Sequence, residues 1–167
     1  AQNVIVSEAV RRNLDICATD IAAAFLQCVT DEELAKLTGE TEREVTFYLP
    51  PHNVAMLRTL FGFKDFDPRA EVIHCDKPGT GLVDAPRAFS MKLRQVTEGK
   101  CQLIASSIDP ELCFHHTKSS HGSWEVRLIM TKHVDDLKLT GRREAILHVI
   151  QELQKVFGDL KVEWNEF

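Results

Sequence analysis

Two adjacent aspartates lie between two apolar segments, and this arrangement constrains the fold more than any other feature of the sequence. Residues 124–134 and residues 137–140 are both rich in apolar and β-branched side chains, and Asp135 and Asp136 separate them. The pair is therefore expected at the tip of a β-hairpin. Like charges repel, and each carboxylate requires solvent or a cation. A hairpin that keeps both aspartates gains most when a divalent cation neutralises them.

The rest of the chain alternates strand and helix patterns. The clearest helix spans residues 142–157, where apolar side chains recur at 3.6-residue spacing, and Gly158 ends it. Another helix is expected over residues 84–97, with Pro86 in its first turn, where proline is tolerated. Further strands are expected at 14–19, 44–49, 71–75, 112–117 and 160–164, and shorter helices at 4–12, 31–36 and 54–60. This order predicts an α+β fold with helices packed on one face of an antiparallel sheet.

Composition limits the class of protein. The chain is 44% hydrophobic and 27% charged, which is typical of a globular domain, and no linker or repeat divides residues 1–167, so a single domain is expected. No apolar run approaches the roughly 18 residues of a membrane span, so no membrane partner is expected. The five scattered cysteines indicate free thiols in a reducing, intracellular compartment, either cytoplasm or nucleus, with an organelle also compatible. The net charge of −5 argues against strong nucleic-acid binding by this chain alone.

A third carboxylate, Asp20, ends the strand predicted at 14–19. Mg²⁺ prefers hard oxygen ligands, commonly one or two carboxylates together with substrate phosphates. Phosphoryl transfer by two metals needs carboxylates that hold both ions a few ångströms apart. An Asp-Asp pair alone is most often a solvated turn, so the interpretation depends on the segments that accompany it.

Five segments resemble, in the same order, motifs of Ty1/copia-type retrotransposon reverse transcriptases. Residues 19–26 (TDIAAAFL) resemble the first palm motif, and residues 48–51 (YLPP) resemble the segment that follows it. Residues 77–89 match without a gap the block K-x-L-Y-G-L-K-Q-A-P-R-A-W. Residues 107–114 resemble S-x-D-P-C-L-Y, and residues 133–137 (HVDDL) lie where the family has Y-V-D-D-L. The resemblance implies the palm domain of an RNA-directed DNA polymerase.

The resemblance also assigns roles to residues. Asp20 and Asp135 would coordinate both Mg²⁺ (or Mn²⁺) ions, and Asp136 would be the third catalytic and metal-binding carboxylate. Phe25 would lie against the sugar of the nucleotide and select deoxynucleotides, although an ordinary core aromatic is the alternative. The other expected contacts to nucleotide are Ile21, Ala22 and Asp84, and the expected contacts to the template-primer are Arg87, His133 and Lys77. For Arg87, a surface salt bridge is the alternative.

Several departures from the family pattern leave a second function open. Asp84 replaces a glutamine and puts a carboxylate near the incoming triphosphate, unless it turns away to cap its helix. Gly79 and Thr80 replace Leu-Tyr, and His133 replaces a tyrosine. The fingers and thumb of the family are expected to be absent or truncated. The function expected from the resemblance is template-directed transfer of deoxynucleotides to a primer. The alternative is a domesticated, catalytically idle palm that serves as a subunit of a larger assembly. A nuclease using the same carboxylates has no distinct motif.

Overall fold

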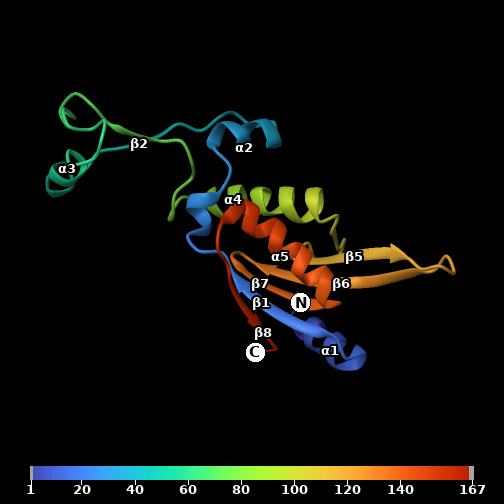
Figure 1. The fold of residues 1–167 in the computed structure, drawn as a ribbon. Helices are drawn as coiled ribbons and strands as arrows, with labels where there is room; N and C mark the ends of the chain where they lie inside the picture. Colours follow the sequence, from blue (N-terminus) through green and yellow to red (C-terminus); the bar gives the residue numbers. More distant parts are fainter. Residues whose placement is uncertain (1, 166–167) are drawn as a thin grey trace.

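A six-stranded antiparallel sheet forms the body of the protein in a computed structural model that describes residues 2–165 (Figure 1). The strand order is β4-β5-β6-β7-β1-β8. The bounds are β4 (Ile104–Ala105), β5 (Leu112–Lys118), β6 (Trp124–His133), β7 (Asp136–Gly141), β1 (Asp15–Asp20) and β8 (Lys161–Trp164). The α+β class and the antiparallel sheet predicted from the sequence are confirmed.

The hairpin between β6 and β7 differs by one residue from the prediction. His133 pairs with Asp136, so the two-residue turn consists of Val134 and Asp135. Asp136 is already the first residue of β7. The two aspartates therefore have different backbone roles, one in the turn and one in the sheet.

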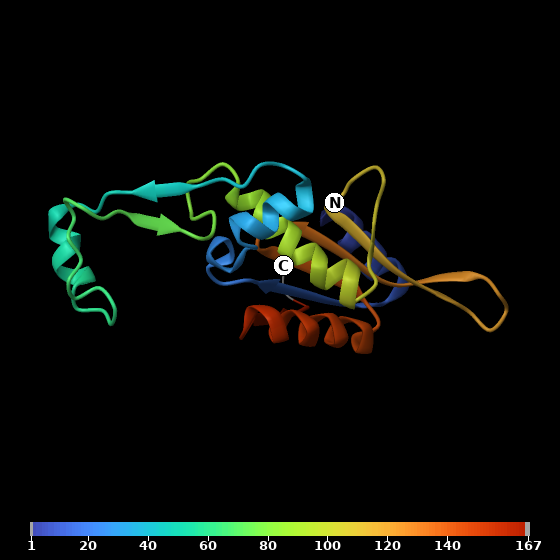
Figure 2. The same cartoon turned by 90° about the horizontal axis from the view of Figure 1, so that it is seen from above.

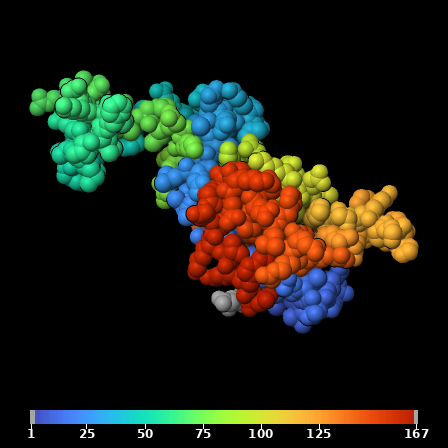
Figure 3. All heavy atoms as spheres, viewed as in Figure 1, coloured from blue at the N-terminus to red at the C-terminus, as the bar shows by residue number. Residues whose placement is uncertain are grey.

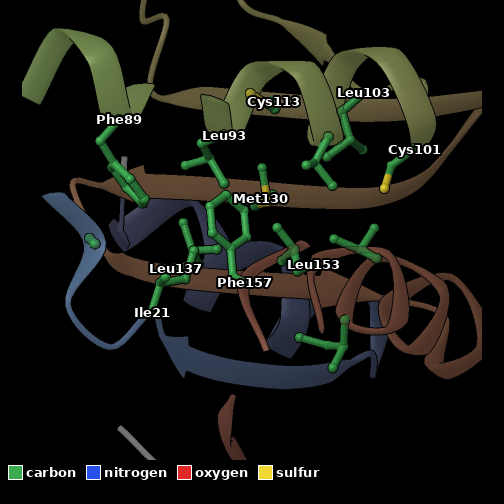
Figure 4. Close-up of a cluster of buried hydrophobic side chains, with 14 of the residues drawn as sticks. Ile21, Phe89, Leu93, Cys101, Leu103, Cys113, Met130, Leu137, Leu153 and Phe157 are labelled. Carbon is green, nitrogen blue, oxygen red and sulfur yellow. The ribbon is translucent and has the colours of Figure 1, made fainter. Parts of the chain in front are cut away.

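Helices α4 (Ala85–Arg94) and α5 (Arg143–Phe157) pack on one face of the sheet (Figures 1 and 2). A π-helical turn, Gln95–Lys100, continues α4. The apolar stripe of α5 lies in the core, as its spacing predicts. Figure 4 shows this core between the helices and the central strands. Its most buried side chains include Ile21, Phe89, Leu93, Met130, Leu137, Leu139, Ile146 and Leu153.

Helix α1 (Gln2–Arg12) lies on the opposite face, so the expected packing of helices on one face holds for α4 and α5 but not for α1. Ile5 and Ala9 of α1 pack against Ile16 of β1 and Ile129 of β6. Successive side chains of a strand point to opposite faces, so Ile16 and Ile129 point away from the main core. Their apolar surface requires a cover of its own, and α1 provides it.

Residues 40–80 include an arm that projects from the body (Figures 2 and 3). It consists of a two-stranded ribbon, β2 (Val45–Phe47) with β3 (Ile73–Cys75), and helix α3 (Pro51–Leu57). Helix α2 (Asp31–Thr38) precedes it and begins with a capping box between Thr30 and Glu33. Within residues 2–165, no helix has the length and apolar character needed to cross a bilayer.

Candidate active site

Asp20 and Asp136 face each other across the central strands β1 and β7. The Ile21 amide donates to the Asp135 carbonyl oxygen at 3.2 Å, which makes Asp20–Asp136 a non-hydrogen-bonded pair of the antiparallel ladder. Side chains in such pairs lie on the same face, with Cβ atoms about 4.5–5.5 Å apart. A small hollow of about 90 Å³ is lined by both carboxylate residues. The sheet therefore places two like charges directly opposite one another.

The turn beside this pair holds a strained residue. Val134 has a φ of 57°, in the left-handed region that β-branched side chains rarely adopt. Strain of this kind costs about 1–3 kcal/mol and concentrates at functional sites. Asp135 follows Val134, and the hydrogen bond from Ile21 to its carbonyl fastens the turn to the end of β1. Asp20, Asp135 and Asp136 thus lie at the same end of the sheet.

Two lysines lie next to the aspartates on the same face. The Nζ atom of Lys138, two residues after Asp136, is 3.9 Å from Oδ2 of Asp136. Lys161 of β8 is the cross-strand partner of Asp20, and its Nζ atom is 2.5 Å from Oε1 of Glu163. Side chains alternate between the two faces along β7, so the sequence already indicates that Lys138 lies on the same face as Asp136. That Lys161 lies beside Asp20 depends on the pairing of β8 with β1. These cations partly offset the repulsion between the carboxylates.

The donor set fits a hard divalent cation, but the carboxylates are not drawn together as in a closed metal site. Asp20, Asp135 and Asp136 supply only oxygen ligands, the type that Mg²⁺ prefers. Across residues 2–165, no three His, Cys, Asp or Glu side chains lie close enough to hold a metal between them. Ligation would therefore require the carboxylates to converge through side-chain rotation, with substrate phosphates completing the coordination.

The predicted nucleotide contacts divide between the core and the surface. Ile21 is fully buried, so only its backbone is available to a ligand, whereas Ala22 is exposed. Phe25 is half-buried and meets Phe89 edge to face, with ring centroids 6.4 Å apart. Phe25 thus packs on the core, as the alternative interpretation holds, and keeps part of its ring accessible. His133 pairs with Asp136 and lies exposed on the same face as the carboxylates.

The other predicted binding residues lie between the arm and α4. Asp84 precedes α4 and its side chain makes no capping hydrogen bond, so the alternative in which Asp84 caps its helix does not hold. Its carboxylate instead forms an ion pair with Arg43. Arg87 donates to Glu40 at 2.8 and 3.0 Å, which is the surface salt bridge of the alternative interpretation. Lys77 is exposed in the loop after β3.

A larger hollow than the one at the aspartates lies elsewhere in the molecule. A cavity of about 760 Å³ lies in the arm and is lined by residues 58–66 and 71–73. None of the predicted catalytic or binding residues lines it. Comparison with protein-family models, curated proteins and solved structures finds no match to this chain.

Proposed function

We propose that this chain is the palm of an RNA-directed DNA polymerase of the Ty1/copia retrotransposon type, which adds deoxynucleotides to a primer by two-metal phosphoryl transfer. The observation that supports this most is the opposed pair Asp20–Asp136 beside the strained Val134–Asp135 turn. Without a cation, opposed like charges and a β-branched residue at positive φ both reduce stability. Their coincidence at one end of the sheet favours a functional rather than a structural role.

In this proposal, Asp20 and Asp135 hold both divalent ions and Asp136 supplies the third carboxylate. When bound, the ions activate the primer 3′-hydroxyl and stabilise the leaving pyrophosphate. The backbone hydrogen bond between Ile21 and Asp135 keeps the turn in register with β1. Phe25, held by its edge contact with Phe89, presents the remaining part of its ring to the nucleotide sugar. His133, beside Asp136, packs near the primer end.

Primer extension by the purified chain tests the proposal. The assay uses an RNA template with a DNA primer and deoxynucleotides, with Mg²⁺ in one series and Mn²⁺ in another. Asp135→Asn removes one charge at the turn, and Asp159→Asn makes the same change in the exposed loop before β8. Incorporation that persists in Asp159→Asn and disappears in Asp135→Asn is the expected result. Incorporation that survives in Asp135→Asn would refute the assigned site.

A catalytically idle palm that serves as a binding subunit is the second candidate, and one observation favours it. The ion pair of Lys138 with Asp136 and the position of Lys161 opposite Asp20 offset the acidic charge without a metal. A Lys138→Gln variant separates the two functions. If the lysine suppresses metal binding, this variant binds Mg²⁺ more tightly than the wild type. Folded wild-type protein that incorporates no nucleotide with either metal would favour the binding subunit.

A further inference from the structure

Strand β8 forms one edge of the six-stranded sheet, and one of its sides is open. It pairs with β1, and no other strand among residues 2–165 pairs with it. An edge strand presents backbone amides and carbonyls that can accept a further strand. The strand at the opposite edge, β4, is only two residues long. The open side of β8 is therefore the better candidate site for the addition of a strand.

The hydrogen bonds of β8 show which backbone groups face the open side. The amide of Asn165, just after the strand, donates to a carbonyl oxygen of β1 at 3.0 Å, so the backbone of Asn165 points toward β1. In an antiparallel ladder this direction alternates from residue to residue. The backbone groups of Lys161 and Glu163 therefore also point toward β1. Those of Val162 and Trp164 point away from it, toward the open side.

The side chains of this segment form an apolar set and a charged set. Val162 and Trp164 pack against the main core, together with Leu160 just before the strand. Lys161 and Glu163 point to the other face, where they line the small hollow at the aspartates. Residues 160–164 thus alternate apolar and charged side chains, with a basic residue on one side of Val162 and an acidic residue on the other.

A second copy of the chain fits this pattern. When two β8 strands pair in antiparallel fashion about a twofold axis at Val162, Lys161 of each copy lies opposite Glu163 of the other. On the core face, Leu160 lies opposite Trp164 of the second copy, and the two valines meet. Lys161 and Glu163 of one strand already form an ion pair. Each charge therefore has opposite charges beside it along its own strand and across the interface, which favours cross-strand pairing.

The neighbouring registers lack this match. Antiparallel pairing joins residues whose backbone groups face the same way, so the nearest alternatives move the twofold axis by one residue. An axis at Lys161 would place two lysines opposite each other, and an axis at Glu163 would place two glutamates opposite each other. Like charges directly opposite one another destabilise a sheet. The charges of β8 therefore favour the axis at Val162.

We propose that two copies of this chain associate through β8, by antiparallel pairing about a twofold axis at Val162. Such an interface uses the same surface on both copies and closes on itself, so association stops at a dimer. Because one short strand carries the contact, we expect a weak dimer in reversible equilibrium with the monomer. The contact requires neither nucleotide nor metal, so the inference does not depend on the polymerase proposal.

Sedimentation equilibrium over a wide range of protein concentrations tests the inference. The wild type should convert reversibly from monomer to dimer as the concentration rises. Glu163→Lys turns both cross-strand attractions into repulsions and should weaken dimerisation at least about tenfold, and Lys161→Glu should do the same. Glu44→Lys makes the matched charge change at an exposed residue before β2 and should dimerise like the wild type.

Mixing the two charge variants separates the proposed register from damage to the fold. Neither variant should pair with itself, but an equimolar mixture of Lys161→Glu and Glu163→Lys again places opposite charges across the interface. The mixture should therefore form a heterodimer, and a chain that carries both substitutions should dimerise with itself. Hydrogen exchange gives a second readout, because the amides of Val162 and Trp164 should become protected as the concentration rises.

Several outcomes would overturn the inference. Wild-type protein that stays monomeric at every concentration would leave the open side of β8 to a strand from a different protein. A dimer that persists unchanged in Glu163→Lys would exclude β8 as the contact. A mixture of the two charge variants that stays monomeric would exclude the proposed register. A wild-type dimer in which the Val162 amide exchanges as fast as in the monomer would exclude the backbone pairing.

Discussion

Replacement of Gly141 by alanine tests the strand register that places the aspartates. Gly141 ends β7 and pairs with Leu128 of β6 and Asp15 of β1. A Cβ atom at residue 141 would lie 2.4 Å from the Arg127 carbonyl oxygen and 2.9 Å from the Leu128 Cα atom. Both are backbone atoms of β6, and the Arg142 amide already donates to that carbonyl at 3.1 Å. No side-chain rotation relieves this contact.

The strands would have to separate by about 1 Å to restore an ordinary contact of 3.4 Å or more. Overpacking of this kind costs about 1–3 kcal/mol. Loosening a ladder hydrogen bond costs about 0.5–1.5 kcal/mol more. We therefore expect Gly141→Ala to lower the free energy of unfolding by about 2–4 kcal/mol.

Urea denaturation followed by circular dichroism measures this loss. Gly99→Ala is the matched control, because Gly99 lies in the helical turn after α4 and an added Cβ has no heavy atom within 4 Å. Alanine should stabilise that position by about 0.4–1 kcal/mol. If Gly141→Ala unfolds within 0.5 kcal/mol of the wild type while the control behaves as expected, the close approach of β7 to β6 is wrong.

Three further predictions concern charge and thiols. Burial raises the pKa of the Asp31 carboxyl in the folded protein above its value in the unfolded chain. The folded protein therefore loses stability as the pH rises from the unfolded-state pKa through the folded-state pKa, where Asp31 becomes charged. Asp31→Asn removes this cost, so it should stabilise the protein at pH 7 and stabilise it less near pH 4. Urea denaturation at both pH values measures this, and an equal effect at both would contradict it. Burial raises the pKa of Cys17 and of Cys101 to about 11, so both remain protonated at pH 8, and the thiolate is the form that reacts. A thiol reagent at pH 8 should therefore label the half-buried Cys75 first. It should label all five cysteines only after the protein is unfolded. Rapid labelling of Cys17 in the folded protein, detected by mass spectrometry, would refute this. Without divalent cations, Asp20→Asn should raise the free energy of unfolding by about 0.2–1 kcal/mol, because it removes an opposed like charge. Added Mg²⁺ should stabilise the wild type more than this variant in thermal unfolding, and an equal shift would argue against Asp20 as a ligand.

Local features of the fold are readable from the sequence. The apolar stripe at 3.6-residue spacing predicts a helix over residues 142–157. The observed α5 starts one residue later, at Arg143, and ends at Phe157 as predicted. Thr30 and Glu33 form the cap that their types and spacing favour. The Asp-Asp hairpin is present, displaced by one residue in its turn. These features depend on interactions between residues close in the chain, so pattern and propensity suffice to predict them.

The tertiary structure decided which distant residues meet. The opposed pair Asp20–Asp136 depends on the register between β1 and β7, which are more than a hundred residues apart in the chain. Both faces of the sheet carry apolar side chains, so each face needs its own hydrophobic core, and helix α1 covers Ile16 and Ile129 on the second face. No local sequence pattern specifies this packing. The ion pair of Asp84 with Arg43 and the burial of Asp31 arise where the base of the arm meets α2 and α4. A side chain's type and its position along a strand or helix are properties of the sequence. Its neighbours across the sheet, its exposure and hence its electrostatic environment exist only once the chain has packed.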